Sequence, residues 1–170
     1  IKLADQGYYE LVPWENYSSN FYRMDQVAPN TREYVFNNPN LGYPERRDGG
    51  KMWERGEFIL SQLQGGGCVA SPTENYVEYF GMANGLRIDD PASGYDPNDP
   101  WTDRDPRFYF NIVIDGERIV KRNAGEDTFA KLYINGRHRN PSVNSTTGYV
   151  HKKFRDITCN RFDRGWGNWR

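Results

Sequence analysis

The stretch that decides the fold runs from Ser71 to Gly116, with the sequence SPTENYVEYFGMANGLRIDDPASGYDPNDPWTDRDPRFYFNIVIDG. Its first part predicts a helix over residues 72–80. Ser71 and Glu74 stand three residues apart, so their side chains can satisfy each other's unpaired backbone amides in a capping box. Pro72 suits the first helical position, because its fixed φ angle matches a helix and its missing N–H would be unpaired there.

The predicted helix is expected to run into a long coil. Val77 and Phe80 place apolar side chains at helical spacing, and Gly81 or Gly85 can end the helix. Three prolines between residues 89 and 105 then hold the backbone extended and remove donors that a sheet would need.

A β-hairpin is predicted after the coil. Residues 108–114 favour a strand, and the Asp115-Gly116 dipeptide that closes them is the strongest short-range hairpin signal. Residues 117–120 are expected to return as the partner strand. Two further strands are predicted over residues 129–134, before Asn135-Gly136, and over residues 148–155. The fold class predicted from these elements is α+β and loop-rich.

Several motifs, in order along the chain, resemble the SusD/RagB family. They are Ser71-Pro72-Thr73-Glu74 before an aromatic-rich helix, Met82-x-x-Gly85, Gly94-Tyr95-Asp96-Pro97, Asp103 to Tyr109, and Thr147-Gly148-Tyr149 with Lys152-Lys153-Phe154. The resemblance covers residues 7–156. It implies part of a SusD-like fold, which is mostly α with short β-hairpins when complete. Residues 1–170 are then expected to be a single-domain fragment, the middle to C-terminal region, without the N-terminal helical repeats, the lipid-anchor cysteine and the closing helices.

The resemblance also implies a function. Members of the family are outer-membrane lipoproteins on the cell surface of Bacteroidetes that serve nutrient uptake and polysaccharide utilisation. They capture mostly glycans and hand them to a TonB-dependent, SusC-like transporter. The implied protein is therefore carbohydrate-binding and non-catalytic, with a lipid anchor outside this chain as its only membrane attachment. Two alternatives remain open: a peptide- or protein-binding member of the same family, and a glycoside hydrolase on this scaffold.

Composition excludes some classes of function. The chain has 22 Lys and Arg against 23 Asp and Glu, a net charge of −1, so it lacks the basic excess that nucleic-acid binding requires. No apolar run approaches the roughly 20 residues of a membrane-spanning helix. Aromatic residues make up 15% of the chain. They predict a core built from rings, such as the stripe of Trp14, Tyr17 and Phe21, although some rings could instead be exposed to stack on sugars.

Catalytic motifs are poorly represented. His138 and His151 lack the spacing of a metal-binding pair and lie among basic residues, so both are expected to be solvated. The sequence contains neither a nucleophile elbow nor a phosphate-binding loop. Cys68 and Cys159 form no disulfide framework, and both a single bridge and two free thiols remain open. The sequence predicts no enzyme and no cofactor.

The aspartates of the coil allow three interpretations. Asp103 and Asp105 could be mistaken for a glycosidase pair, but such carboxylates usually come from separate elements. Arg104 and Arg107 stand beside them, which favours a local network of ion pairs and turns. The acidic run could also hold a structural calcium ion, or its side chains could cap their own backbone. Its members are Asp89, Asp90, Asp96, Asp99, Asp103 and Asp105.

Ligand contacts are predicted first in the irregular segment from residue 37 to 67. Trp53 is the proposed stacking ring, with Tyr43 and Arg55 as its neighbours, because rigid scaffolds commonly present binding groups on such loops. Trp101 and Tyr95 are the second choice. They belong to the motif-bearing coil, where packing is the competing role.

Overall fold

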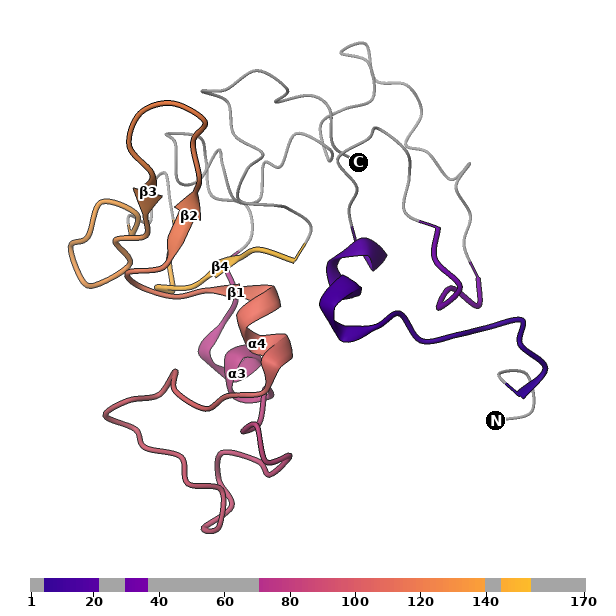
Figure 1. Ribbon diagram of the computed structural model, residues 1–170. Helices are drawn as coiled ribbons and strands as arrows, with labels where there is room; N and C mark the ends of the chain where they lie inside the picture. Colours follow the sequence, from indigo (N-terminus) through magenta and orange to yellow (C-terminus); the bar gives the residue numbers. More distant parts are fainter. Residues whose placement is uncertain (1–4, 22–29, 37–70, 140–144, 154–170) are drawn as a thin grey trace.

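The computed structural model describes residues 5–21, 30–36, 71–139 and 145–153. Its elements, in chain order, are η1 (Trp14–Asn20), α3 (Glu74–Glu78), α4 (Pro106–Asn111), β1 (Ile112–Val113), β2 (Arg118–Val120), β3 (Thr128–Phe129) and β4 (Val150–His151) (Figure 1). Short helices, short strands and long loops agree with the predicted α+β, loop-rich class. Cys68 and Cys159 lie outside the described residues, as does the end of the strand predicted at 148–155.

Helix α3 forms within the predicted range but has a different cap. Thr73 is the N-cap, and its side chain accepts a hydrogen bond from the first turn. The predicted capping box of Ser71 and Glu74 is therefore wrong. Both side chains bond the segment 145–149 instead: the Ser71 hydroxyl accepts from a backbone N–H at 3.2 Å, and the Glu74 carboxylate accepts from a tyrosine hydroxyl at 3.2 Å.

Helix α4 replaces most of the strand predicted over residues 108–114. Asp105 is its N-cap, with the carboxylate accepting from the backbone N–H of Arg107 at 2.8 Å, and Pro106 follows at the first helical position. This start signal outweighs the strand preference of the aromatic run behind it. Only Ile112 and Val113 are in a strand.

The strands pair differently from the prediction. β1 pairs antiparallel with β4, and β2 pairs antiparallel with β3. The predicted hairpin between residues 108–114 and 117–120 is therefore wrong, although its turn exists, because Gly116 has a φ of +77°. The carboxylate of Asp115 accepts from the backbone N–H groups of Leu132 and Tyr133, at 2.6 and 3.2 Å. These bonds direct the turn toward the chain after β3 and away from β1.

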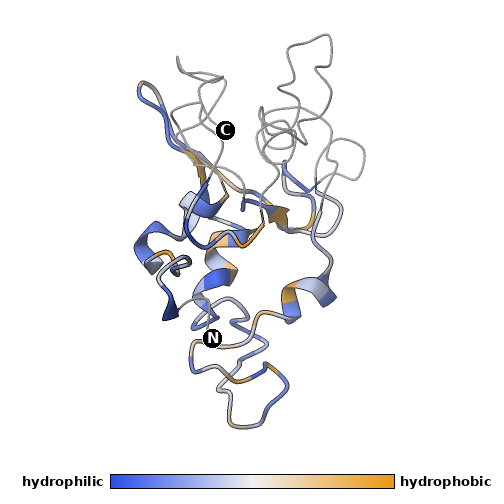
Figure 2. Ribbon diagram, turned by 90° about the vertical axis from the view of Figure 1, so that its right-hand side faces the viewer, coloured by the Kyte–Doolittle hydropathy of each residue, from blue (hydrophilic) through white to orange (hydrophobic). Residues whose placement is uncertain are grey.

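Two neighbouring apolar clusters form the core. One lies between the strand pairs and contains Val113, Ile119, Val120, Ala130, Leu132 and Val150. The other joins α3 and α4 to β1 and β4 through Val77, Phe108, Ile112 and Tyr149. Hydrophobic segments accordingly lie on the strands and on parts of the helices beside them (Figure 2). This second cluster supports the loop between α3 and α4, which extends away from the strands (Figure 1).

The N-terminal aromatic stripe packs on α4. The rings of Trp14 and Tyr17 lie 5.1 and 5.4 Å from the ring of Phe110, and Phe21 contacts Tyr17. Trp14 is nevertheless 44% exposed, so the prediction that the whole stripe is core is wrong for this ring. Among the described residues, no helix is both long and apolar enough to cross a membrane.

Candidate functional site

The first-choice ligand residues, Trp53, Tyr43 and Arg55, lie outside the described residues. The second choice is described. Trp101 is half-buried against the cluster around Phe108, and Tyr95 is half-buried in the loop between α3 and α4. Neither residue lines the groove that the structure shows, and a ligand role for either stays a prediction.

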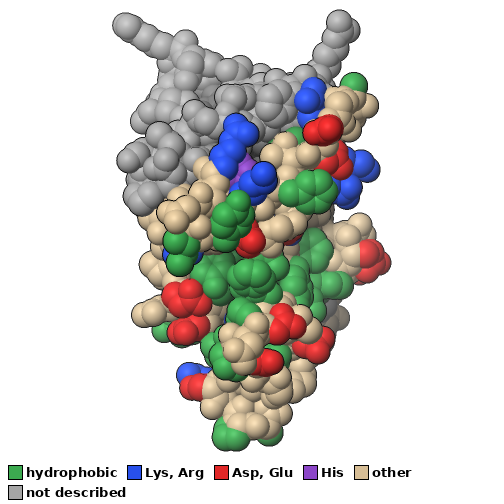
Figure 3. All heavy atoms as spheres, turned by 90° about the vertical axis from the view of Figure 1, so that its left-hand side faces the viewer, with side chains coloured by type: hydrophobic (Ala, Val, Ile, Leu, Met, Phe, Trp, Pro, Cys, Tyr) green, Lys and Arg blue, Asp and Glu red, His purple; other side chains and the backbone are tan. Residues whose placement is uncertain are grey.

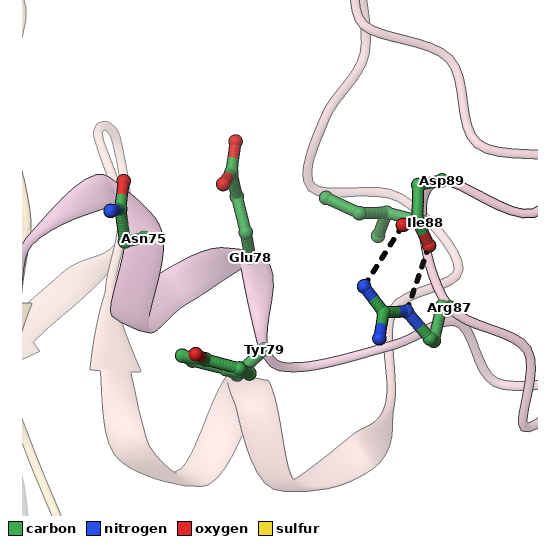
Figure 4. A pocket seen from close by; sticks show the side chains of 6 residues that line it. All are labelled: Asn75, Glu78, Tyr79, Arg87, Ile88 and Asp89. Atoms are coloured by element: carbon green, nitrogen blue, oxygen red, sulfur yellow. Dashed lines mark hydrogen bonds and ion pairs between the residues drawn. The ribbon is translucent and has the colours of Figure 1, made fainter.

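An open groove lies between helix α3 and the loop that follows it. Its volume is about 560 Å³. The lining residues are Asn75, Glu78, Tyr79, Arg87, Ile88 and Asp89. Figure 4 shows Asn75 and Glu78 on the helix side, with Arg87, Ile88 and Asp89 on the loop opposite.

The helix side presents an aromatic ring to solvent. Tyr79 caps the C-terminus of α3 and is 86% exposed, whereas the neighbouring Phe80 packs against the core. Val77 on the same helix is 1% exposed. The helix therefore buries Val77 and leaves Asn75, Glu78 and Tyr79 on its open side. Several rings of this chain are exposed, and Tyr79 is one that lines a groove together with polar side chains.

The loop side carries a fixed ion pair. The Nε and one Nη of Arg87 each donate to one oxygen of Asp89, both at 2.9 Å. This hydrogen-bonded pairing lowers the pKa of the Asp89 carboxyl and raises that of the Arg87 guanidinium. Both groups are solvent-exposed, so the pair remains accessible to a ligand in the groove.

A turn positions this loop against the helix. The backbone N–H of Met82 donates to the carbonyl of Leu86 at 2.8 Å, and the side chain of Asn84 accepts from the N–H of Leu86 at 3.0 Å. A Cβ at Gly81 would lie 2.5 Å from the same Leu86 carbonyl oxygen, so only glycine permits this close approach. Gly81 lies two residues beyond the C-cap of α3, where the chain turns toward the loop.

Arg104 is buried against the end of α3. It is 2% exposed, and its guanidinium donates to the carbonyls of Val77, Phe80, Gly81 and Pro100 over 2.6–3.3 Å. Three of these carbonyls belong to the end of α3 and the turn after it. The guanidinium thus adds donors to carbonyls at the end of the helix, of which those of Val77 and Gly81 also accept from the backbone N–H groups of Phe80 and Asp105.

The sequence analysis did not predict this role of Arg104. The guanidinium carbon also lies 4.9 Å from the Phe108 ring centroid and 5.6 Å from that of Tyr95. The predicted local ion pair exists, but between Asp105 and Arg107. The pattern Asp-Arg-Asp-Pro-Arg does not reveal which arginine turns inward. Only the packing of residue 104 against Phe108 settles that.

A polar contact beside the core ties α3 to β4. The Tyr149 hydroxyl donates to Glu74 at 3.2 Å. Burial raises the pKa of Tyr149; Trp101 acts against this rise, and the nearby Glu74 carboxylate adds to it. The contact fixes the start of α3, from which the helix side of the groove projects.

The histidines are not solvated as expected. His138 is 3% exposed, and its Nδ1 accepts from the backbone N–H of Lys131 at 2.9 Å. His151 is half-buried, and burial, with a contribution from Lys153, lowers its pKa. The prediction was wrong because their basic neighbours in sequence do not determine burial. Lys131–His138 is a structural contact within the loop after β3.

The coil aspartates bond their own backbone. Asp90 and Asp96 each accept from the N–H two residues ahead at 2.8 Å, and Asp105 does the same at the start of α4. This is the capping arrangement expected from the sequence. In the described part of the chain, no group of three or more His, Cys, Asp or Glu side chains is arranged to hold a metal ion. A structural calcium stays a prediction.

The groove therefore combines an exposed ring with hydrogen-bonding side chains. The family model of the SusD family matches residues 32–170, and the chain belongs to that family. Its members are in general non-catalytic, glycan-binding proteins of nutrient uptake at the outer membrane. No curated protein and no solved structure shows significant similarity to the chain.

Proposed function

We propose that this protein captures an oligo- or polysaccharide at the cell surface and passes it, uncleaved, to a TonB-dependent transporter. Membership of the SusD family supports the general role. The single structural observation that carries the proposal is the 86% exposed Tyr79 in a groove lined by an amide, two carboxylates and a guanidinium.

The groove suits the chemistry of a sugar ring. A pyranose has an apolar face of C–H groups, which stacks on an aromatic ring, and a rim of hydroxyls that both donate and accept. Tyr79 offers the flat face. Asn75 offers an amide, while Arg87 and Asp89 offer donors and acceptors held in place by their own pairing. An open groove also leaves room for a chain to extend beyond the bound unit.

The groove carboxylates support capture without cleavage. A glycosidase needs a carboxylic acid that stays protonated at working pH, so its pKa must be raised, and a second carboxylate across the scissile bond. Asp89 has the opposite property, because its pairing with Arg87 lowers the carboxyl pKa. Glu78 is exposed on the other side of the groove.

Trp53, with Tyr43 and Arg55, remains our proposal for a second contact with the same glycan. Trp101 and Tyr95 remain a further proposal, for a ligand that reaches the coil beside the groove. A glycan chain is long enough to contact several rings. Each contact can be removed separately.

Handover requires a surface that meets the transporter. On the face shown in Figure 3, hydrophobic side chains gather in the middle, with acidic side chains on several sides of them and basic side chains mostly above. A mixed surface of this kind suits a contact that forms and releases. We propose that the transporter contacts this chain, together with the parts of the whole protein outside it.

The test is glycan binding with single-ring variants. Tyr79→Ala and Trp53→Ala should each weaken binding by about tenfold to a hundredfold, as expected for losing a stacking ring worth roughly 1–3 kcal/mol. Tyr133→Ala is the matched control, because this tyrosine is exposed but does not line the groove. Binding to a peptide panel in place of glycans, or release of reducing ends from polysaccharides, would overturn the proposal.

A further inference from the structure

We infer that the Tyr79 groove selects neutral saccharide units over uronic-acid or sulfated ones, and that Asp89 is the residue that determines this selectivity. The inference rests on the proposed glycan capture and adds the class of glycan. It concerns the side chain of Asp89, which lines the groove and pairs with Arg87.

The charges of the lining favour a neutral ligand. Among the described lining residues, Glu78 and Asp89 are acidic and Arg87 is the one basic side chain. The groove therefore carries a net negative charge when all three are ionised. An anionic sugar entering beside the Tyr79 ring meets repulsion from both carboxylates, and this repulsion is stronger near a protein surface than in bulk water.

Arg87 is the group that an anionic sugar would need, but Asp89 already occupies it. A carboxylate binds a guanidinium best through two parallel hydrogen bonds, and Asp89 makes both, at 2.9 Å each, with Nε and one Nη. Asp89 lies two residues along the same loop, so it competes as an intramolecular ligand at high effective concentration. A uronate would have to displace it and leave the Asp89 carboxylate without its partner.

A neutral sugar needs no such displacement. The paired Arg87 keeps its second Nη, and Asp89 keeps lone pairs on both oxygens, for contacts with hydroxyl groups. Asn75 adds an amide that both donates and accepts. The ion pair thus acts as a fixed array of donors and acceptors with little net charge, which matches the mixed hydrogen-bonding character of a hydroxyl rim.

The experiment measures binding of two glycan sets of matched length to the full-length protein: neutral malto-, cello-, xylo- and manno-oligosaccharides, and oligogalacturonate. The variants are Asp89→Asn, which frees Arg87, and the double variant Arg87→Gln/Asp89→Asn. Asp96→Asn is the control, because it changes the net charge equally on an exposed aspartate that does not line the groove. Melting curves should match for all variants, since Asp89 and Asp96 are both exposed.

We expect the wild type to bind a neutral oligosaccharide and to bind oligogalacturonate weakly. Asp89→Asn should gain about tenfold or more in oligogalacturonate affinity at low ionic strength, since a charge-assisted bidentate contact becomes available. The gain should vanish in the double variant and be absent in Asp96→Asn.

The other outcomes overturn either the selectivity alone or the proposed glycan capture as well. Wild-type binding of oligogalacturonate as tight as that of neutral glycans, or no gain in Asp89→Asn, overturns the selectivity while glycan capture stands. Absence of binding to glycans of either class overturns the proposed capture, and the selectivity falls with it.

Discussion

Two arginines near the end of α3 occupy opposite environments. Arg104 is 2% exposed and donates to four backbone carbonyls, whereas the side chain of Arg87 is 83% exposed and pairs with a carboxylate. The buried guanidinium is bonded to groups that cannot move without unfolding the helix end. The exposed guanidinium is bonded to a side chain that solvent and ligands can reach. The same side chain therefore supports the shape in one place and offers hydrogen bonds in the other.

The two arginines differ in role because only the guanidinium of Arg104 is removed from water. A charge removed from water is strongly destabilising unless every donor finds an acceptor, so a buried arginine persists only in a complete set of partners. An exposed ion pair stabilises a fold little, because water and salt screen it. The difference indicates that Arg104 is there for stability and that Arg87 and Asp89 are free to serve binding.

Replacing each arginine with methionine should separate the two roles most clearly. Arg104→Met should lower the free energy of unfolding by about 3–4 kcal/mol, because it removes four buried hydrogen bonds and the contact of the guanidinium with the Phe108 ring. Arg87→Met should leave the unfolding free energy unchanged within error. Denaturant titration of both variants is the measurement.

Arg104→Lys is the control that separates the charge of the side chain from its hydrogen-bonding geometry. Arg104→Lys keeps the charge but cannot reach four carbonyls with the same planar geometry, so it should recover only part of the loss. If Arg104→Met is as stable as the wild type, the buried guanidinium is not what holds the helix end, and the contrast with Arg87 fails.

Two adjacent aromatic residues just after α3, Tyr79 and Phe80, provide the second comparison. Phe80 packs against the core cluster and lies 6.0 Å from the Phe108 ring, so Phe80→Ala should destabilise the fold by about 2 kcal/mol. Tyr79→Ala should leave the unfolding free energy nearly unchanged and weaken glycan binding. Thermal unfolding of the two variants tests the predicted stabilities, and a glycan-binding assay on the same proteins tests the predicted loss of binding. A loss of stability in Tyr79→Ala would mean that this ring packs in the whole protein.

Local signals in the sequence predicted the elements better than their pairing. The helix near Pro72, the glycine turn at Gly116 and the aspartate caps follow from nearest-neighbour chemistry, and the structure has all three. Strand pairing depends on distant partners. The backbone N–H groups of Leu132 and Tyr133, which bond Asp115, cannot be identified from the dipeptide that begins the turn.

The groove was harder to predict for the same reason. Tyr79 and Phe80 are neighbours with similar apolar character, and the sequence gives no sign of which one is exposed. That choice depends on where α4 places Phe108. The pairing of Arg87 with Asp89, in contrast, spans only two residues and could have been read from their spacing.

The smallest expected effect compares two aspartates whose pKa values are both lowered by an arginine. Asp105 caps α4, and its side chain is 17% exposed, whereas the side chain of Asp89 is 65% exposed. Asp105→Asn should keep the cap, since asparagine also accepts from the N2 amide, and lose only the charge. We therefore expect about 0.5–1 kcal/mol of lost stability at neutral pH.

The pH dependence gives this prediction its sign. Hydrogen bonding to Arg107 lowers the pKa of Asp105 below its ordinary value of 3.8, so the charged form is favoured in the folded state. Its stabilisation is fully present above pH 3.8 and is lost as the pH falls through the lower folded-state pKa. Wild type and Asp105→Asn should thus differ in unfolding free energy at neutral pH and converge in acid.

Asp89→Asn should follow the wild type at every pH, because solvent screens that pair. Asp89→Asn could instead lose more unfolding free energy than Asp105→Asn at neutral pH and regain the wild-type value in acid. In that case the groove pair supports the fold, and its assignment to binding is wrong.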